Sequence, residues 1–195
     1  MSTAAALPPI ISRADLAGLG LSRQRLYAMA RAGELELIAP GCFARPGELD
    51  DTTANWASIS LRKPSATICL LSALSLHELT DEIPQETDIA VPRGERTLAT
   101  RFTPIRWHSF DRATFDLGRA QHRLTDEGLT IGLSSPERTI IDVFRRRHEI
   151  GADIANEALE RWLRRRGSAP ATLLDLARSF PQALPALRAT LQILL

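Results

Sequence analysis

The sequence contains a single lysine, Lys63, and all its other basic side chains are arginines. A Schiff-base or P-loop mechanism would have to use Lys63, which stands between Arg62 and Pro64 with no glycine-rich loop before it. Restriction-endonuclease-like nucleases also place a lysine beside metal-binding carboxylates on a strand, and Lys63 has no such setting. The sequence therefore argues against these chemistries, whereas arginine suits phosphate and guanine recognition.

Cysteine and long apolar runs are scarce too. Cys42 and Cys69 make neither a disulfide framework nor a CxxC ligand pair, and both lie in apolar stretches, which predicts two buried thiols and no structural zinc. No apolar run approaches the roughly 18 to 20 residues of a membrane span, and Met1–Ala6 lacks the features of a secretory signal. We expect a cytoplasmic protein that uses no membrane, metal or cofactor.

What is present is an ordinary globular composition. The 195 residues are 44% hydrophobic, and 24 basic against 23 acidic side chains leave a formal net charge of +1. The whole-chain charge therefore points to neither nucleic acid nor membrane, and any basic site must be local. A polar stretch rich in turn residues, 45–51, marks a domain joint. We predict an α+β (mixed α/β) protein with a winged helix-turn-helix domain at 1–47 and an α/β domain at 48–195 that ends in helices.

The first domain has the order helix, turn, helix. Ser12 is placed to cap a short helix through Ala17, the glycines of 18–20 predict a tight turn, and Ser22 caps a second helix that reaches about Ala32. Gly33 follows as a C-cap. Two short strands are then predicted at 35–39 and 42–45 around the Pro40-Gly41 turn, and these would form the wing.

The second helix presents a basic outward face. At about 100° per residue, Leu26, Met29 and Ala30 share the inward face. Arginines near the N-terminus would add to backbone N–H groups that already favour an anion. Such a helix fits the major groove, where glutamine addresses adenine and arginine guanine. A helix-turn-helix of this size can equally be a packing or protein-binding module, and that interpretation stays open.

In the second domain, runs rich in β-branched and aromatic residues predict strands at 87–91, 105–108 and 129–133. Ser135, Pro136 and Glu137 form a helix start, with Ile140, Ile141, Val143 and Phe144 as the buried face. Further helices are predicted at 55–61, at 73–79 with Ser72 as its cap, and at 152–165, 171–180 and 185–195.

Two arginine triplets lie at the ends of predicted helices and form a candidate second basic patch. Cations are also favourable at a helix C-terminus, so a solvated helix end explains the same pattern. The residues are Arg145, Arg146, Arg147, Arg164, Arg165 and Arg166.

No catalytic constellation is present in the sequence. The four histidines have no HxH or HExxH spacing, Asp88 is alone on its strand, and Ser72, Ser134 and Ser135 are explained by capping rather than by a GxSxG elbow. We predict that the protein is not an enzyme.

Three runs resemble AbiEi-type antitoxins of type IV (abortive infection) toxin–antitoxin systems. The stretch from Leu21 to Arg45 is similar to that family's winged helix-turn-helix. LSALSLHELTD at 71–81, with Ile83-Pro84 and IAVPRG at 89–94, resembles the opening of the family's C-terminal domain. SSPERTIID at 134–142 resembles its second signature. Together the runs cover nearly the whole chain in the family's order.

The resemblance implies a bacterial autorepressor that binds repeats in its promoter DNA and counters a nucleotidyltransferase-like toxin encoded beside it, without a stable complex. We expect a monomer in solution. On this model Gln24, Arg31 and Tyr27 read base edges, and Arg23, Arg25 and Arg45 hold phosphates. The complete predicted DNA-binding set is Ser22, Arg23, Gln24, Arg25, Tyr27, Arg31 and Arg45.

Two other classes of function stay open. A ligand-responsive transcriptional regulator unrelated to a toxin would carry a ligand pocket in its larger domain. An enzyme targeted by a DNA-binding head would show turnover, and the missing catalytic constellation argues against it.

Overall fold

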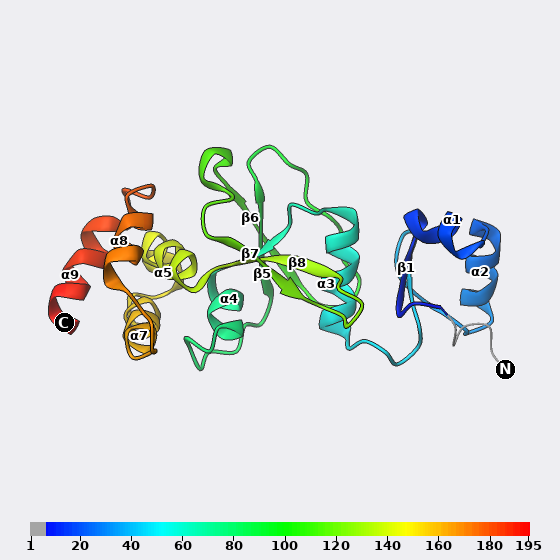
Figure 1. Cartoon of the computed structure of the whole chain (residues 1–195), viewed down its shortest axis with the longest axis horizontal. Coiled ribbons are helices and arrows are strands. Elements are labelled where there is room, and N and C mark those ends of the chain that lie inside the picture. The colour runs from blue at the N-terminus through cyan, green and yellow to red at the C-terminus, as the bar shows by residue number, and fades with distance from the viewer. Residues whose placement is uncertain (1–6) are drawn as a thin grey trace. The chain divides into compact units, whose positions relative to one another are not determined.

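The computed structural model describes residues 7–195 (Figure 1), so the expectation about Met1–Ala6 lies outside the described residues. Helices and strands together make a mixed α/β fold of the α+β kind, as predicted. In chain order the elements are β1 (Ile10–Ser12), η2 (Arg13–Asp15), α1 (Leu16–Leu19), α2 (Arg23–Arg31), β2 (Glu36–Ala39), β3 (Cys42–Ala44), α3 (Asp51–Arg62), β4 (Thr67–Ile68), α4 (Leu70–Leu76), β5 (Thr87–Pro92), β6 (Ile105–Phe110), η3 (Arg112–Thr114), β7 (Arg119–Arg123), β8 (Thr130–Ser134), α5 (Pro136–Arg145), α6 (Arg147–Ile150), α7 (Ala152–Leu163), α8 (Pro170–Ala177) and α9 (Leu184–Leu194).

The chain divides into two compact units by its internal contacts. Among the described residues, unit 1 comprises 7–66, 98–104 and 122–131, and unit 2 comprises 67–97, 105–121 and 132–195. Unit 1 thus contains all of the predicted winged helix-turn-helix together with α3 and two short later segments. The predicted domain boundary between residues 47 and 48 stays a prediction.

In the helix-turn-helix of unit 1, both helical segments begin at the serine caps that the sequence predicts. Ser12 caps η2, which continues into α1, and Gly20 ends α1 in the left-handed conformation at φ 62°. Ser22 then caps α2, its hydroxyl accepting a hydrogen bond from the Arg25 backbone N–H at 3.1 Å. The first helical segment runs two residues beyond the predicted end at Ala17.

A three-stranded sheet of order β1-β3-β2 packs with the helix-turn-helix, and we call the segment 7–47 the head of unit 1. The predicted hairpin is confirmed, and Gly41 occupies the left-handed region at φ 79° in its turn. A register shift between Leu37 and Ala39 lets two consecutive β2 residues point into the core. The core of the head consists of Ile11, Leu26, Met29, Leu35 and Phe43.

Helix α3 begins four residues earlier than predicted. Asp50 caps it by accepting hydrogen bonds from the backbone N–H groups of Thr52 and Thr53 at 2.9 and 3.0 Å. A hydrogen bond from the Thr53 hydroxyl, together with these two backbone hydrogen bonds, lowers the pKa of the Asp50 carboxyl. The buried Asn55 side chain donates to the Thr103 backbone oxygen at 2.9 Å and so fastens the 98–104 segment to this helix.

The second sheet has the order β6-β5-β4-β8-β7. The three strands predicted from β-branched runs are confirmed as β5, β6 and β8, and β5 pairs with β6 in parallel. The sequence did not predict β4, which has only two residues, or β7, whose RAQHR sequence carries no apolar alternation.

The prediction that Ser72 caps a helix is wrong. Helix α4 begins at Leu70, whose φ of 48° is unusual for a leucine, and Ser72 lies inside the helix. Its buried hydroxyl instead accepts a hydrogen bond from the Asp88 backbone N–H at 2.8 Å and so joins α4 to β5. A serine hydroxyl can accept a hydrogen bond from a backbone N–H of a strand as well as from one at a helix start, and the sequence alone does not distinguish the two.

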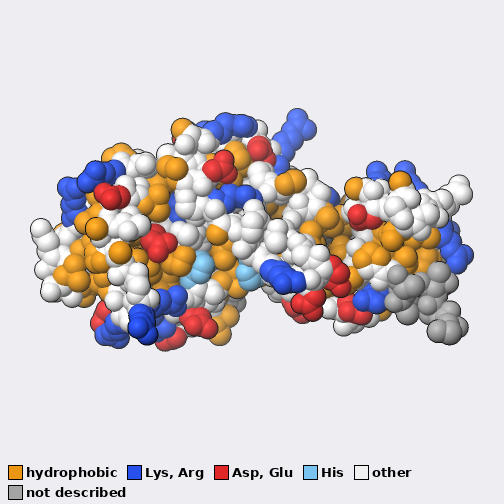
Figure 2. All heavy atoms as spheres, viewed as in Figure 1, with side chains coloured by type: hydrophobic (Ala, Val, Ile, Leu, Met, Phe, Trp, Pro, Cys, Tyr) orange, Lys and Arg blue, Asp and Glu red, His pale blue; other side chains and the backbone are white. Residues whose placement is uncertain are grey.

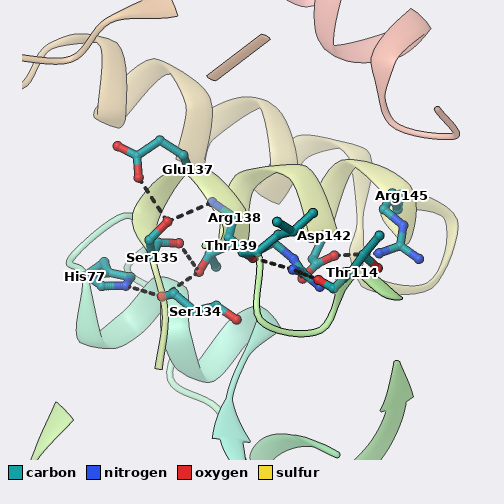
Figure 3. A network of polar contacts seen from close by, with 10 residues as sticks. His77, Thr114, Ser134, Ser135, Glu137, Arg138, Thr139, Asp142 and Arg145 are labelled. Carbon is teal, nitrogen blue, oxygen red and sulfur yellow. Dashed lines mark hydrogen bonds and ion pairs between the residues drawn. The ribbon is translucent and has the colours of Figure 1, made fainter. Parts of the chain in front are cut away.

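Helix α5 starts as predicted, with Ser135 as N-cap and Pro136 in the first turn, and its predicted apolar face is buried. It also buries Arg138, which is 2% exposed, and Asp142, which is 1% exposed. Arg138 Nε donates to Asp142 Oδ2 at 2.7 Å, and its Nη1 donates to the backbone oxygens of Thr114 and Leu117 (Figure 3).

Other groups complete the surroundings of this buried pair. The Arg138 guanidinium lies 4.3 Å from the centroid of the Phe180 ring, and the second oxygen of Asp142 accepts from Arg145 Nη1 at 2.7 Å. Gly118 lies so close that a Cβ there would be 2.6 Å from the Cβ of Arg138. The segment between β6 and β7 is therefore fixed to α5 by an arginine that water hardly reaches.

Figure 1 shows α5, α7, α8 and α9 gathered as a helical layer of unit 2, with apolar faces buried against one another. Both cysteines are free and buried, as predicted, and burial raises the pKa of each thiol. Within residues 7–195, no helix combines the length and apolar character needed to cross a membrane.

We expect Asp142→Asn to lower the free energy of unfolding by about 3 to 5 kcal/mol, because it leaves the buried Arg138 charge without its counter-ion. The measurement is urea unfolding followed by circular dichroism. The control is Glu160→Gln, which removes an exposed i,i+4 pair with Arg164 and should cost no more than about 0.5 kcal/mol. Equal losses in the two variants would contradict this account of α5.

Candidate nucleic-acid interface

Helix α2 carries most of the side chains predicted to bind DNA. Leu26 and Met29 are each 1% exposed and anchor the helix in the core, whereas Arg23, Gln24, Arg25 and Arg31 are exposed. The amphipathic division predicted from the sequence is therefore confirmed. One side of the helix is fixed, and the other presents one amide and three guanidinium groups to solvent.

The first turn of α2 has the wrong charge for an isolated helix. It contains Arg23 and Arg25 and no acidic residue, although a helix N-terminus disfavours cations. Glutamate or glutamine three residues after a serine cap would complete a capping box, and Arg25 stands at that position. By contrast, Ser12 and Asp15 form a complete capping box one element earlier. The α2 N-terminus is thus a concentration of positive charge, which favours binding of an external anion.

Other described residues of unit 1 form no ion pair with these arginines. Within the described part of the chain, Arg23, Arg25 and Arg31 make no ion pair and no side-chain hydrogen bond. Arg23 stacks instead over the ring of Tyr27 at 5.7 Å, and Tyr27 meets Phe43 of β3 edge-on at 5.2 Å. The half-buried Tyr27 ring therefore contacts both Arg23 on the exposed face of α2 and Phe43 in the wing.

Figure 2 shows Lys and Arg side chains at the outer margin of the segment that Figure 1 labels α1 and α2. A helix of nine residues is about 13 Å long, which suits insertion into a major groove. The structure thus brings Ser22, Arg23, Gln24, Arg25, Tyr27 and Arg31 together on one helix. The Ser22 side chain accepts the capping hydrogen bond from the Arg25 backbone N–H and so fixes the start of this helix.

Arg45 lies apart from that group. It follows β3 directly, its backbone N–H donates to the Pro9 oxygen, and its side chain pairs with Glu48 at 3.2 Å. The side chain is only 24% exposed. The phosphate contact predicted for Arg45 stays a prediction. The guanidinium that would make it already has Glu48 as a counter-ion.

The sequence did not single out Arg13, which is exposed and packs on the wing turn at Gly41. Its position depends on β1, a three-residue strand, pairing with β3. No local pattern in the sequence reveals that pairing.

The first arginine triplet is largely engaged within unit 2. Arg145 binds Asp142, Arg146 Nη1 lies 3.1 Å from Glu149 Oε2, and Arg147 donates to the Phe144 backbone oxygen. In the second triplet, Arg164 pairs with Glu160 and Arg165 caps the end of α4 through the backbone oxygens of His77 and Glu78. Arg166 is exposed. These contacts favour the structural interpretation of the triplets over a second basic patch.

Unit 2 joins the two runs that resemble the antitoxin family. His77, at the end of α4, shares a hydrogen bond of 2.7 Å with the Ser134 backbone oxygen, which also accepts from the Thr139 hydroxyl (Figure 3). Burial lowers the pKa of His77, so the neutral imidazole donates this bond. The polar side chains His77 and Thr139 are therefore used in packing the end of α4 against the start of α5.

Two other polar groups of unit 2 were not expected to meet. Asp88 of β5 and His108 of β6 are both largely buried, and Oδ1 of Asp88 lies 2.8 Å from Nε2 of His108. His108 Nδ1 lies 3.4 Å from Arg146 Nη1. Within residues 7–195, no cluster of three or more His, Cys, Asp or Glu side chains is arranged to hold a metal ion.

No protein-family model and no curated protein matches the chain. Among solved structures, the chain is similar to the crystal structure of the RV2827C protein from Mycobacterium tuberculosis, with a TM-score of 0.53 and 20% sequence identity. The match covers 96% of this chain and 78% of that one. At this identity the similarity extends to the fold alone.

Proposed function

We propose that the protein is a DNA-binding antitoxin and transcriptional autorepressor of a type IV toxin–antitoxin operon. The observation that carries the DNA-binding part is the exposed face of α2, where Arg23, Arg25 and Arg31 lie beside Gln24 with no acidic partner. Duplex DNA supplies both the phosphates that such a helix start lacks and the base edges that glutamine and arginine address. Helix α2 would enter the major groove, with the hairpin beside it.

The antitoxin part rests on the resemblance of the runs at 71–94 and 134–142 to the AbiEi family. Both runs lie in unit 2 and meet through His77 and Ser134. In the proposed mechanism unit 1 represses the promoter, and unit 2 counters a nucleotidyltransferase-like toxin without forming a stable complex with it. The protein would act on DNA and on the toxin's activity in the cytoplasm, and it would catalyse no reaction.

The alternative is a ligand-responsive regulator, for which a pocket is expected in the larger domain. Unit 1 contains an open groove of about 560 Å³, which is within the range of small-molecule sites but lies in the other unit. It is lined in part by Pro8, Pro9, Ile10, Leu19, Leu61 and Leu129. A regulator of this kind would bind its operator with an affinity that changes with a cellular metabolite.

The test of the proposed function compares binding to the protein's own promoter with binding to a scrambled duplex, at two salt concentrations. Co-expression with the neighbouring toxin then measures growth rescue. Promoter preference at the higher salt together with rescue supports the proposal. Promoter binding without rescue favours the regulator, and the absence of any DNA binding contradicts both.

Arg23→Ala should weaken binding to every duplex and flatten the slope of log K against log salt by about 0.9, as expected when one phosphate contact is lost. Fluorescence anisotropy over a salt series measures both quantities. Arg178→Ala, which removes an exposed arginine paired with Asp175 on α8, is the control and should leave the slope unchanged. An unchanged slope in Arg23→Ala would remove α2 from the interface.

Arg25→Glu should make the protein more stable while it abolishes DNA binding. Glutamate at this position completes a capping box with Ser22 and suits the helix dipole, which together contribute about 0.5 to 1 kcal/mol. The measurements are thermal unfolding and anisotropy on the same samples. Ala28→Glu places the same charge on the exposed face one turn later and should reduce binding without raising stability. A destabilised Arg25→Glu variant would show that Arg25 serves the fold.

A further inference from the structure

The wing of unit 1 has no basic side chain of its own. From Glu36 to Ala44 the hairpin reads ELIAPGCFA, with a single charged residue, and that residue is acidic. Its turn is formed by Pro40, which is exposed, and Gly41. A hairpin of this composition has no cationic side chain with which to hold a phosphate.

A neighbouring strand places a cation at that turn. Strand β1 pairs antiparallel with β3 so that Ser12 is opposite Cys42, and the next residue, Arg13, comes level with Gly41. The Arg13 side chain lies directly on the glycine, because a Cβ at position 41 would be 2.9 Å from Arg13 Nε and 3.1 Å from its Cγ. Gly41 is thus required twice. It adopts the left-handed turn conformation at φ 79°, and its lack of a Cβ leaves room for the Arg13 side chain.

The chain leaves the Arg13 charge uncompensated. Across residues 7–195, Arg13 makes no ion pair and no side-chain hydrogen bond. The acidic residue nearest to it in sequence, Asp15, is occupied, since its carboxylate accepts from both the backbone N–H and the hydroxyl of Ser12 at 2.7 Å. The guanidinium is therefore held in place by its aliphatic stem while its N–H donors remain available to a ligand.

We propose that Arg13 is the phosphate contact of the wing. Strand β1 supplies the cation that the hairpin lacks, and Gly41 seats it at the turn, where it grips the backbone of duplex DNA. This inference rests on the proposed DNA binding by unit 1, and it assigns to Arg13 the role that the sequence suggested for Arg45. Arg45 lies four residues after Gly41, roughly 13 Å along the strand, and already has Glu48 as its partner.

The experiment measures promoter and scrambled-duplex binding by anisotropy over a salt series for Arg13→Ala, Arg13→Lys and the control Arg178→Ala, which removes an exposed arginine of unit 2. We expect Arg13→Ala to weaken binding to both duplexes and to flatten the log–log slope by about 0.9. Between 50 and 200 mM salt the wild type should then lose about 3.5-fold more affinity than the variant. Arg13→Lys should restore the slope, and Arg178→Ala should match the wild type.

Arg13→Gln keeps part of the stem and separates a lost charge from a disturbed wing. If it reproduces the flattened slope, the charge itself is the contact. Weaker binding with an unchanged slope in both Arg13→Ala and Arg13→Gln would assign Arg13 to the fold and overturn the inference. An unchanged slope in Arg13→Ala beside a flattened slope in Arg23→Ala would overturn the inference alone. Unchanged slopes in both would also remove α2 from the interface, and the absence of DNA binding by the wild type would overturn the proposed function itself.

Discussion

The guanidinium of Arg138 has been removed from water, and only a full set of protein partners makes that arrangement stable. Asp142 provides the opposite charge and accepts from Nε, two backbone oxygens of the segment before β7 accept from Nη1, and Phe180 covers one face. Helix α5, the 114–118 segment and the α8–α9 connection are therefore fixed by one side chain. The polar side chains of the run 134–142 therefore bind largely inside the fold, where they position α5 and the segments packed on it.

The head of unit 1 follows the opposite electrostatic design. Arg23 and Arg25 stand in a first helical turn that contains no acidic residue, and Arg13 lies at the wing turn with no ion pair among residues 7–195. Such a surface lowers the stability of the free protein, and an anion that binds it restores that stability by mass action. If the proposed function holds, DNA phosphates neutralise the arginines of the head in the way that Asp142 neutralises Arg138 in unit 2.

The sequence predicted elements whose signals are local. Ser22 and Ser135 cap their helices, the Pro40-Gly41 turn forms, and β5, β6 and β8 arise from β-branched runs. The sequence could not predict features that depend on distant partners. Ser72 has the chemistry of a cap but binds Asp88 across to β5, and β7 is too polar to show alternation. On the candidate site, the face of α2 followed from periodicity, whereas Arg13 reaches the wing only through β1–β3 pairing.

The two cysteines are distributed one to each unit, with Cys42 in the wing of unit 1 and Cys69 before α4 in unit 2. Both thiols are buried, at 3% and 0% exposure, so a thiol-reactive reagent meets either one only when the surrounding structure opens. Each unit therefore carries an internal reporter of its own opening. The two modification rates, resolved by peptide mass, separate the local stability of the head from that of unit 2 in the unaltered chain, with and without DNA.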